Sequence, residues 1–323
     1  MRYLPLFSRQ LWPAGITRRQ YIFQGGVKDW IMSGSWSVNP GVTKKKVSLC
    51  LHAVEEIADA SLHDALRMSG AAFESATSVS VYLAEPRSYA WQFISYYYAG
   101  YFAANALMRL SGYSSVNLSA SECGEINQRS LLYGVGGTDD KNKIAVGQFY
   151  MYTDLSNTPS LEMAAVSSKG GVHIQFWTSF LRFLGVLRHC VVSSGLPKSD
   201  RDFAIAELDL LVANLKFSGV QTGAWLSEVR NGLNYRLDYG AWFPYDNCVS
   251  NGSTLKDAFK QASLGNIGLP TPSQNLSAPE RASRVSASLL AWLKTSLVTL
   301  EATVSGEKKS SISKGVFGVM SRL

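Results

Sequence analysis

The chain is poor in the residues that build metal sites and disulfide frameworks. It has four cysteines and four histidines in 323 residues. No C-x-x-C pair and no H-E-x-x-H arrangement occurs among them, and the cysteines are dispersed along the sequence. We therefore expect free thiols, no bound metal and no cofactor. The cysteines are Cys50, Cys123, Cys190 and Cys248.

Sequence signals for export and for several enzyme classes are also missing. Residues 1–19 are interrupted by Arg2, Arg9, Arg18 and Arg19, so they contain no apolar run typical of a secretory signal. This favours a cytoplasmic protein with reduced thiols. No Gly-Lys-Ser/Thr phosphate loop, no G-x-S-x-G elbow and no dinucleotide-binding glycine fingerprint is present, which argues against the corresponding nucleotide-binding and hydrolase folds.

Apolar residues are abundant, at 46% of the chain, and most of them recur at helical spacing. The spacing predicts an amphipathic helix over 47–68. It also predicts a helix over 87–111 in which no charged residue separates Arg87 from Arg109, and which Pro86 opens. This second helix has no polar face, so we expect it at the centre of a core. Its many tyrosines and amides argue against a membrane location.

The rest of the chain predicts further helices and one β-rich insertion. Helical patterns cover 172–193, 199–217 and 222–236, and Ser277 with Glu280 forms a capping-box pattern for a last helix through Thr303. Residues 114–171 lack the helical period and contain β-prone runs at 130–135 and 145–152. The sequence therefore predicts a mainly α fold with a small β-hairpin insertion.

Charge divides the chain into three predicted segments. Of the formal net charge of +7, residues 1–46 carry eight basic residues against one acidic residue, and residues 306–323 carry four against one. We interpret 1–46 as a basic N-terminal arm, 47–305 as the helical domain with its insertion at 114–171, and 306–323 as a basic C-terminal tail. Such ends are expected to contact RNA or an acidic partner, and solvated termini are the alternative. The predicted phosphate contacts are Arg18, Arg19, Lys44, Lys45 and Lys46.

The segment 223–239 carries the most informative polar pattern. On a helix, Arg230, Asn231 and Tyr235 share one face and the apolar residues occupy the other. Gly232 is unfavourable in a helix interior, which suggests that another group, such as a second helix, approaches its backbone. The alternative is that these residues form only the solvated face of a core helix.

Two segments together resemble the HEPN domain superfamily. The run Tyr97-Tyr98-Ala99-Gly100-Tyr101-Phe102-Ala103-Ala104-Asn105-Ala106-Leu107, followed by Gly112, resembles the aromatic second helix of these domains. The run Arg230-Asn231-Gly232-Leu233-Asn234-Tyr235 is similar to their later helix, which carries Arg and then His or Tyr. The resemblance covers about forty residues directly.

The resemblance implies a helical bundle that pairs with a second copy and cleaves RNA without a metal ion, as in bacterial toxins and phage-defence effectors. Arg230 would then hold the scissile phosphate, and Asn231 would orient it or the attacking 2′-hydroxyl. Tyr235 stands where the family often has His, and a phenol is a poorer general base than imidazole at neutral pH. The alternative is a non-catalytic HEPN-like subunit of a larger complex that binds RNA, a nucleotide or a protein.

Overall fold

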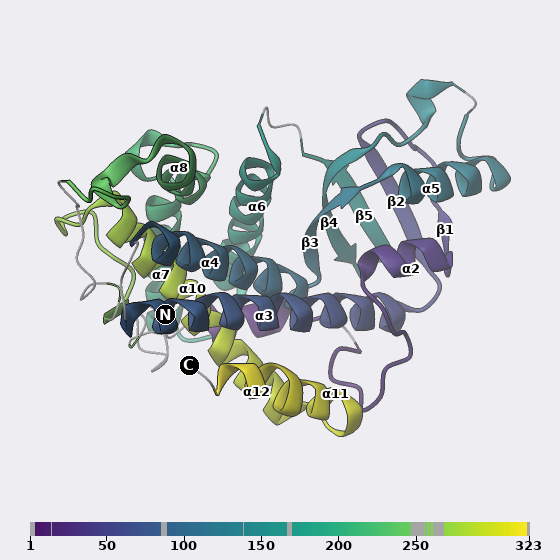
Figure 1. The fold of residues 1–323 in the computed structure, drawn as a ribbon. Helices are drawn as coiled ribbons and strands as arrows, with labels where there is room; N and C mark the ends of the chain where they lie inside the picture. Colours follow the sequence, from purple (N-terminus) through teal and green to yellow (C-terminus); the bar gives the residue numbers. More distant parts are fainter. Residues whose placement is uncertain are drawn as a thin grey trace.

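The computed structural model describes residues 4–13, 15–84, 89–137, 139–166, 170–246 and 268–321, together with Leu255, Asp257, Ala258 and Lys260. A helical body lies beside an antiparallel five-stranded sheet whose strand order is β1-β2-β5-β4-β3 (Figure 1). The strands are β1 (Trp36–Val38), β2 (Lys46–Leu51), β3 (Tyr113–Leu118), β4 (Gly147–Asp154) and β5 (Ser160–Ala165).

Two long helices, α3 (Val54–Ala84) and α4 (Tyr89–Leu110), run through the body, and most of the other helices pack around them (Figure 1). The central one, α4, is buried over most of its surface and completely from Ala103 to Leu110, which confirms its predicted place at the centre of the core, whereas Trp91 in its first turn is exposed; its proposed start at Pro86 and Arg87 lies outside the described residues. A β-carbon on Gly100 would lie 2.5 Å from Ser286 Oγ, so α4 and α10 approach closely at this glycine. The longer helices are α3 (Val54–Ala84), α4 (Tyr89–Leu110), α5 (Ala120–Leu132), α6 (Val172–Ser193), α7 (Lys198–Leu215) and α10 (Ala278–Thr303).

Three predicted helices in the second half of the chain are confirmed within a few residues. Helix α6 covers the predicted 172–193, α7 covers most of 199–217, and α10 begins after Ser277 and ends at Thr303. The Ser277 side chain accepts the Glu280 backbone N–H and Glu280 accepts the Ser277 backbone N–H, as the capping-box pattern predicted. These helices have long periodic patterns, which are the strongest helical signal in a sequence.

The predicted helix over 47–68 is wrong in its first turns. Residues 46–51 form β2, and α3 begins only at Val54. Val47, Leu49 and Leu51 alternate with less buried residues and point into the core of the sheet. Val47 and Leu51 are also four residues apart, so over six residues the same pattern fits a helix as well, and pairing with β1 and β5 decides the outcome.

The insertion at 114–171 contributes three strands, but it is neither a simple hairpin nor free of helix. Residues 120–132 form α5, so the predicted strand over 130–135 is wrong. Ser119 and Glu122 form a capping box at its start, and this Ser-x-x-Glu pattern is visible in the sequence. Strand β4 does cover most of the predicted 145–152 run, but it pairs with β3 and β5.

The sheet has two faces with different partners. Val47, Leu49, Phe149, Met151 and Met163 belong to a core that the sheet shares with α2 (Val27–Ser33) and α5. The other face carries Gln148 and Tyr150 and lies toward α4 and α6 (Figure 1). The alternation along β4 therefore separates two hydrophobic cores, one on each side of the sheet.

Both basic ends are folded into the body, which differs from the arm and tail predicted for them. Residues 1–46 include α1 (Leu4–Ser8), α2 and β1, and Trp30 and Trp36 are fully buried. Residues 306–321 form α11 (Gly306–Ser310), a π-helical turn (Ser311–Val316) and α12 (Phe317–Met320), which pack on α3. The formal charge count could not reveal this, because the buried aromatic and aliphatic residues between the charges determine the packing.

Candidate functional site

Arg230 lies at the end of α8 (Trp225–Asn231), a short helix that leads into a π-helical turn over Gly232–Arg236. Trp225, Leu226 and Val229 are buried against the helical core, as the predicted amphipathic pattern requires. Arg230 and Asn231 are partly exposed and Tyr235 is exposed. The local sequence therefore anchors one face of α8 and presents these three residues on the other.

The Arg230 guanidinium is held by neutral groups. Its Nη2 donates to the Tyr98 hydroxyl at 2.7 Å, and its Nη1 donates to Asn231 Oδ1 at 2.7 Å. The guanidinium carbon lies 5.6 Å from the Tyr98 ring centroid and 5.4 Å from that of Tyr235. Within the described part of the chain no carboxylate lies at ion-pair distance from it, and Nε has no hydrogen-bond partner. The positive charge is therefore oriented but not neutralised.

His173, in the first turn of α6, belongs to the same cluster. Its Nδ1 lies 2.8 Å from the Tyr97 hydroxyl, and its ring lies 4.8 Å from the Tyr101 ring and 6.0 Å from the Tyr98 ring, centroid to centroid. Burial lowers the pKa of His173, and the positive charge of Arg230 lowers it further. An imidazole whose pKa is below its ordinary value near 6.5 is neutral at physiological pH.

The Tyr97 hydroxyl holds His173 Nδ1 in a hydrogen bond. Trp177 Nε1–H donates to the same hydroxyl oxygen at 3.3 Å. Burial raises the pKa of Tyr97, so its phenol keeps a proton that it can donate to His173 Nδ1. In that arrangement the neutral ring carries its proton on Nε2, from which His173 can donate to an anion.

Gly232 is needed, but not for a second helix. A β-carbon there would lie 2.8 Å from Asp238 Oδ2 and 3.0 Å from the Tyr239 ring. Leu237 and Tyr239 have φ values of 57° and 70°, which fold the chain back on the end of α8. The close approach that the sequence suggested therefore comes from the turn that immediately follows.

Exposed aromatic side chains occur at Tyr235, over the Arg230 guanidinium, and around the turn that follows α8. Tyr235 is 68% exposed, and Phe243 and Trp91 are 84% and 51% exposed. Trp91 packs edge to face against Trp242, with ring centroids 5.6 Å apart, and Trp242 Nε1 donates to the Leu233 carbonyl. Flat apolar rings next to an unneutralised guanidinium offer both a stacking surface and a charge to a ligand.

The predicted phosphate contacts in the N-terminal segment do not join this cluster. Arg18 forms an ion pair with Glu55 at 2.6 Å, and Arg19 packs against Gly306. Lys44, Lys45 and Lys46 are exposed in the turn before β2 and at its start, and β2 lies at the opposite end of the molecule from α8 (Figure 1). They form a separate basic surface.

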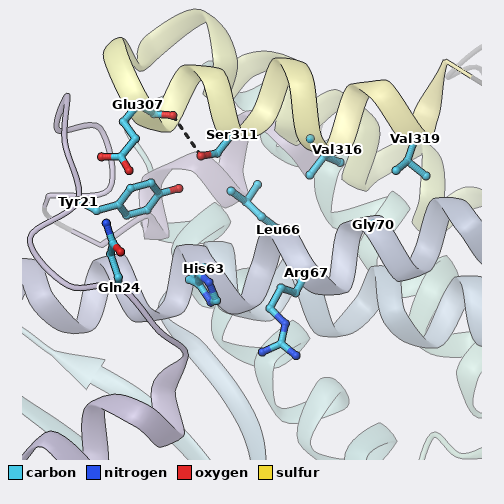
Figure 2. A pocket seen from close by; sticks show the side chains of 11 residues that line it. Tyr21, Gln24, His63, Leu66, Arg67, Gly70, Glu307, Ser311, Val316 and Val319 are labelled. Carbon is cyan, nitrogen blue, oxygen red and sulfur yellow. Dashed lines mark hydrogen bonds between the residues drawn. The ribbon is translucent and has the colours of Figure 1, made fainter.

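A cavity of about 520 Å³ lies between α3 and the C-terminal helices. Figure 2 shows Tyr21, Leu66, Ser311, Val316 and Val319 along it, while the Arg67 side chain leads away from the C-terminal helices. This cavity is lined mainly by apolar atoms and does not include Arg230 or His173.

The sequence pattern identified Arg230, Asn231 and Tyr235 but missed His173, Tyr97 and Tyr98 as their neighbours. These residues come from α4, α6 and α8, and no spacing in the sequence brings them together. An available signal was the polar His173 next to Phe176 and Trp177 on an otherwise apolar helical stripe. The three described cysteines, Cys50, Cys123 and Cys190, are free and do not belong to the cluster, and Cys248 lies outside the described residues.

Comparisons with known proteins add no assignment: no protein family, curated protein or solved structure matches this chain. Among the described residues, no group of three or more His, Cys, Asp or Glu side chains is arranged to hold a metal ion. None of the described helices is both long and apolar enough to cross a membrane.

Proposed function

We propose that the protein is a metal-independent endoribonuclease of the HEPN type, of the kind found in bacterial toxins and phage-defence systems. The observation that carries this proposal is Arg230, which pairs with no carboxylate of the described residues and which Tyr98 and Asn231 fix beside the neutral imidazole of His173. The resemblance of residues 97–112 and 230–235 to HEPN helices also supports an endoribonuclease of this type.

In this proposal Arg230 binds the scissile phosphate. The 2′-hydroxyl attacks phosphorus, the bond to the 5′-oxygen breaks, and the products are a 2′,3′-cyclic phosphate and a free 5′-hydroxyl. Arg230 stabilises the negative charge that increases on the phosphate oxygens in the transition state. Asn231 accepts from Arg230 Nη1, so it acts as a positioning residue that holds the guanidinium in place.

His173 supplies an imidazole in place of the His that HEPN domains often have at the position of Tyr235. A phosphate at Arg230 offsets the positive charge that lowers the His173 pKa, so binding of RNA favours the protonated ring. The protonated ring delivers its proton to the leaving 5′-oxygen, while the proton of the 2′-hydroxyl passes to water. Tyr235, exposed over the guanidinium, stacks on a base of the bound strand.

The proposal includes RNA as substrate and a second copy of the chain, or a larger complex, as partner. In HEPN pairs two arginine-bearing helices line one cleft, and the exposed aromatic residues near α8 are suited to cover part of such an interface. Light scattering of the purified protein measures the oligomeric state directly, and a strictly monomeric active enzyme would contradict this part of the proposal.

Cleavage of single-stranded RNA in the presence of a chelator tests the activity. We expect products that end in a cyclic phosphate, and Arg230→Ala should reduce the rate by about 10²–10³, as for other groups that stabilise a transition-state charge. Arg236→Ala is the matched control, because Arg236 is exposed on the following turn and paired with Asp238. Equal cleavage by the wild type and Arg230→Ala would end the ribonuclease proposal.

The exposed aromatic residues favour one second candidate, a non-catalytic subunit that binds RNA through the same surface. Trp91, Tyr235 and Phe243 would stack on bases while Arg230 holds a phosphate. Retention of RNA without cleavage, lost in Arg230→Ala and in Tyr235→Ala, is the result that separates this candidate from the nuclease.

A further inference from the structure

A second cavity lies where the sheet meets the central helices, and we call it the junction cavity. Its volume of about 460 Å³ is within the range of small-molecule sites. It draws residues from α2, α3, α4, β3 and β4, so it is built by the whole junction and not by one loop. Its lining includes Lys28, Arg67, Tyr101, Phe102, Arg109 and Gln148.

A chain of hydroxyl hydrogen bonds leaves one buried acceptor without a donor. Ser179 Oγ donates to the Gln175 carbonyl, so Ser115 Oγ must donate to Ser179 Oγ. Ser115 can then only accept from Gln148, whose Nε2 lies 2.8 Å away. This fixes the Gln148 amide with Oε1 as a free acceptor. Gln148 is only 7% exposed, and Oε1 has no partner among the described residues.

The buried cation at this cavity is incompletely paired. Arg109 Nη1 donates to Asn105 Oδ1 at 2.9 Å, but Nε lies 3.7 Å from Asp64 Oδ2, too far for a hydrogen bond, and has no other acceptor among the described residues. Burial lowers the pKa of Arg109, and Asp64 offsets this only in part. A guanidinium buried in this way is stabilised by an additional anionic oxygen.

The carboxylates that line the cavity already accept hydrogen bonds from backbone N–H groups, whereas not every cation that lines it has an ion-pair partner among the described residues. Asp29 accepts the Gly26 N–H and Asp64 accepts the Val27 N–H. Arg67 is exposed, and the described residues provide it with no ion-pair partner. The cavity therefore presents Arg67 and Arg109 to an incoming anion.

One wall of the cavity is aromatic. Tyr101 and Phe102 line it, with ring centroids 5.6 Å apart, and Met68 also lines it. Aromatic faces and a methionine favour a flat ring in the ligand.

We propose that the junction cavity binds a small organic anion in which a phosphate or carboxylate is joined to a flat ring that carries N–H donors. The anionic group lies at Arg109 and Arg67, the ring packs on Tyr101 and Phe102, and one ring N–H donates to Gln148 Oε1. This site contains neither Arg230 nor His173, and it borders their cluster at Tyr101, whose ring lies 4.8 Å from the His173 ring, centroid to centroid.

Isothermal titration calorimetry with two matched pairs of compounds tests the proposal. Adenosine 5′-monophosphate carries a phosphate joined through ribose to a flat ring with N–H donors, and orotate carries a carboxylate directly on such a ring; adenosine and uracil are their uncharged counterparts. We expect at least one of the two anions to bind at least about tenfold more tightly than its counterpart, and the two anions show which group the site prefers. Inorganic phosphate alone should bind weakly, because it lacks the ring.

Two variants that should keep the fold locate the binding. Arg67→Ala changes an exposed residue and should weaken the bound anion about tenfold, the factor that a charge-assisted hydrogen bond supplies. Gln148→Met keeps the volume and removes the acceptor, and should weaken the anion and its uncharged counterpart alike. Arg188→Ala, at an exposed arginine of α6, and Arg230→Ala should leave binding unchanged. Thermal melting of each variant shows that it is folded.

Three results would overturn the proposal. The first is that neither of the two anions binds at millimolar concentration, and the second is that the charged and uncharged members of each pair bind equally. Binding that survives both Arg67→Ala and Gln148→Met would place the anion elsewhere. If Arg230→Ala alone abolished binding, the anion would belong to the Arg230 cluster and not to the junction cavity.

Discussion

Lys308 and Arg230 show two opposite uses of a basic residue in the same chain. Lys308 is completely buried, and its Nζ lies 2.5 Å from Asp59 Oδ1 and donates to the Gly15 carbonyl. Asp59 also accepts the backbone N–H groups of Ile22 and Phe23. Arg230 is partly exposed and bonded only to neutral oxygens within the described residues. The first cation joins three parts of the fold, and the charge of the second is not neutralised by any carboxylate of the described residues.

The difference shows that net charge alone does not identify a nucleic-acid surface. Lys308 belongs to a basic terminal segment, yet its charge is cancelled inside the protein. Arg230 lies in a part of the chain with no basic cluster, yet its charge is available. A cation indicates a binding site when the structure fixes it in place without giving it a carboxylate.

The largest effect is expected from Lys308→Met. The substitution leaves Asp59 as a buried charge without its partner, which should lower the free energy of unfolding by about 3–5 kcal/mol. Denaturant unfolding measures this, and Lys309→Met is the control because Lys309 is exposed. If the two variants were equally stable, the Lys308–Asp59 pair would not hold the N-terminal segment, α3 and α11 together.

Arg230→Gln should have a much smaller effect on stability. The amide can keep a hydrogen bond to Tyr98, so we expect a loss of no more than about 1 kcal/mol in the free energy of unfolding. The same denaturant experiment measures it beside Lys308→Met. A loss as large as that of Lys308→Met would assign Arg230 to the structural use of charge and weaken its proposed role in binding.

The smallest effect concerns pH. The His173 pKa is lowered in the folded protein, so neutral His173 favours folding above the unfolded value near 6.5, and this contribution is lost as pH falls from there through the lowered pKa. Because Arg230 is one cause of the lowering, Arg230→Gln should reduce the loss of stability between neutral and acid pH. Melting curves from pH 7.5 to 5 in both proteins measure the difference, and identical pH profiles would show that Arg230 has no influence on His173.

The sequence predicted α4, α6, α7 and α10 well because their apolar periodicity extends over many residues, but it placed α3 at 47–68 where the helix runs from Val54 to Ala84. It missed β1 and β2 because three and six residues are too few to distinguish a strand from a helix end, and because β2 pairs with β5, a segment more than a hundred residues away. It found Arg230 from its neighbours on one helix. It could not find His173 beside it, because α4, α6 and α8 meet only in the folded protein.

The most direct test of a joint Arg230–His173 site is an NMR titration of His173, assigned with His173→Gln. We expect a pKa below 6.5 in the wild type, a higher value in Arg230→Gln, and a higher value than in the free wild type when a 2′-deoxy dinucleotide that cannot be cleaved is bound to it. These three results would show that Arg230 and His173 respond to the same phosphate. A His173 pKa that is unchanged by both the substitution and the dinucleotide would contradict a joint site.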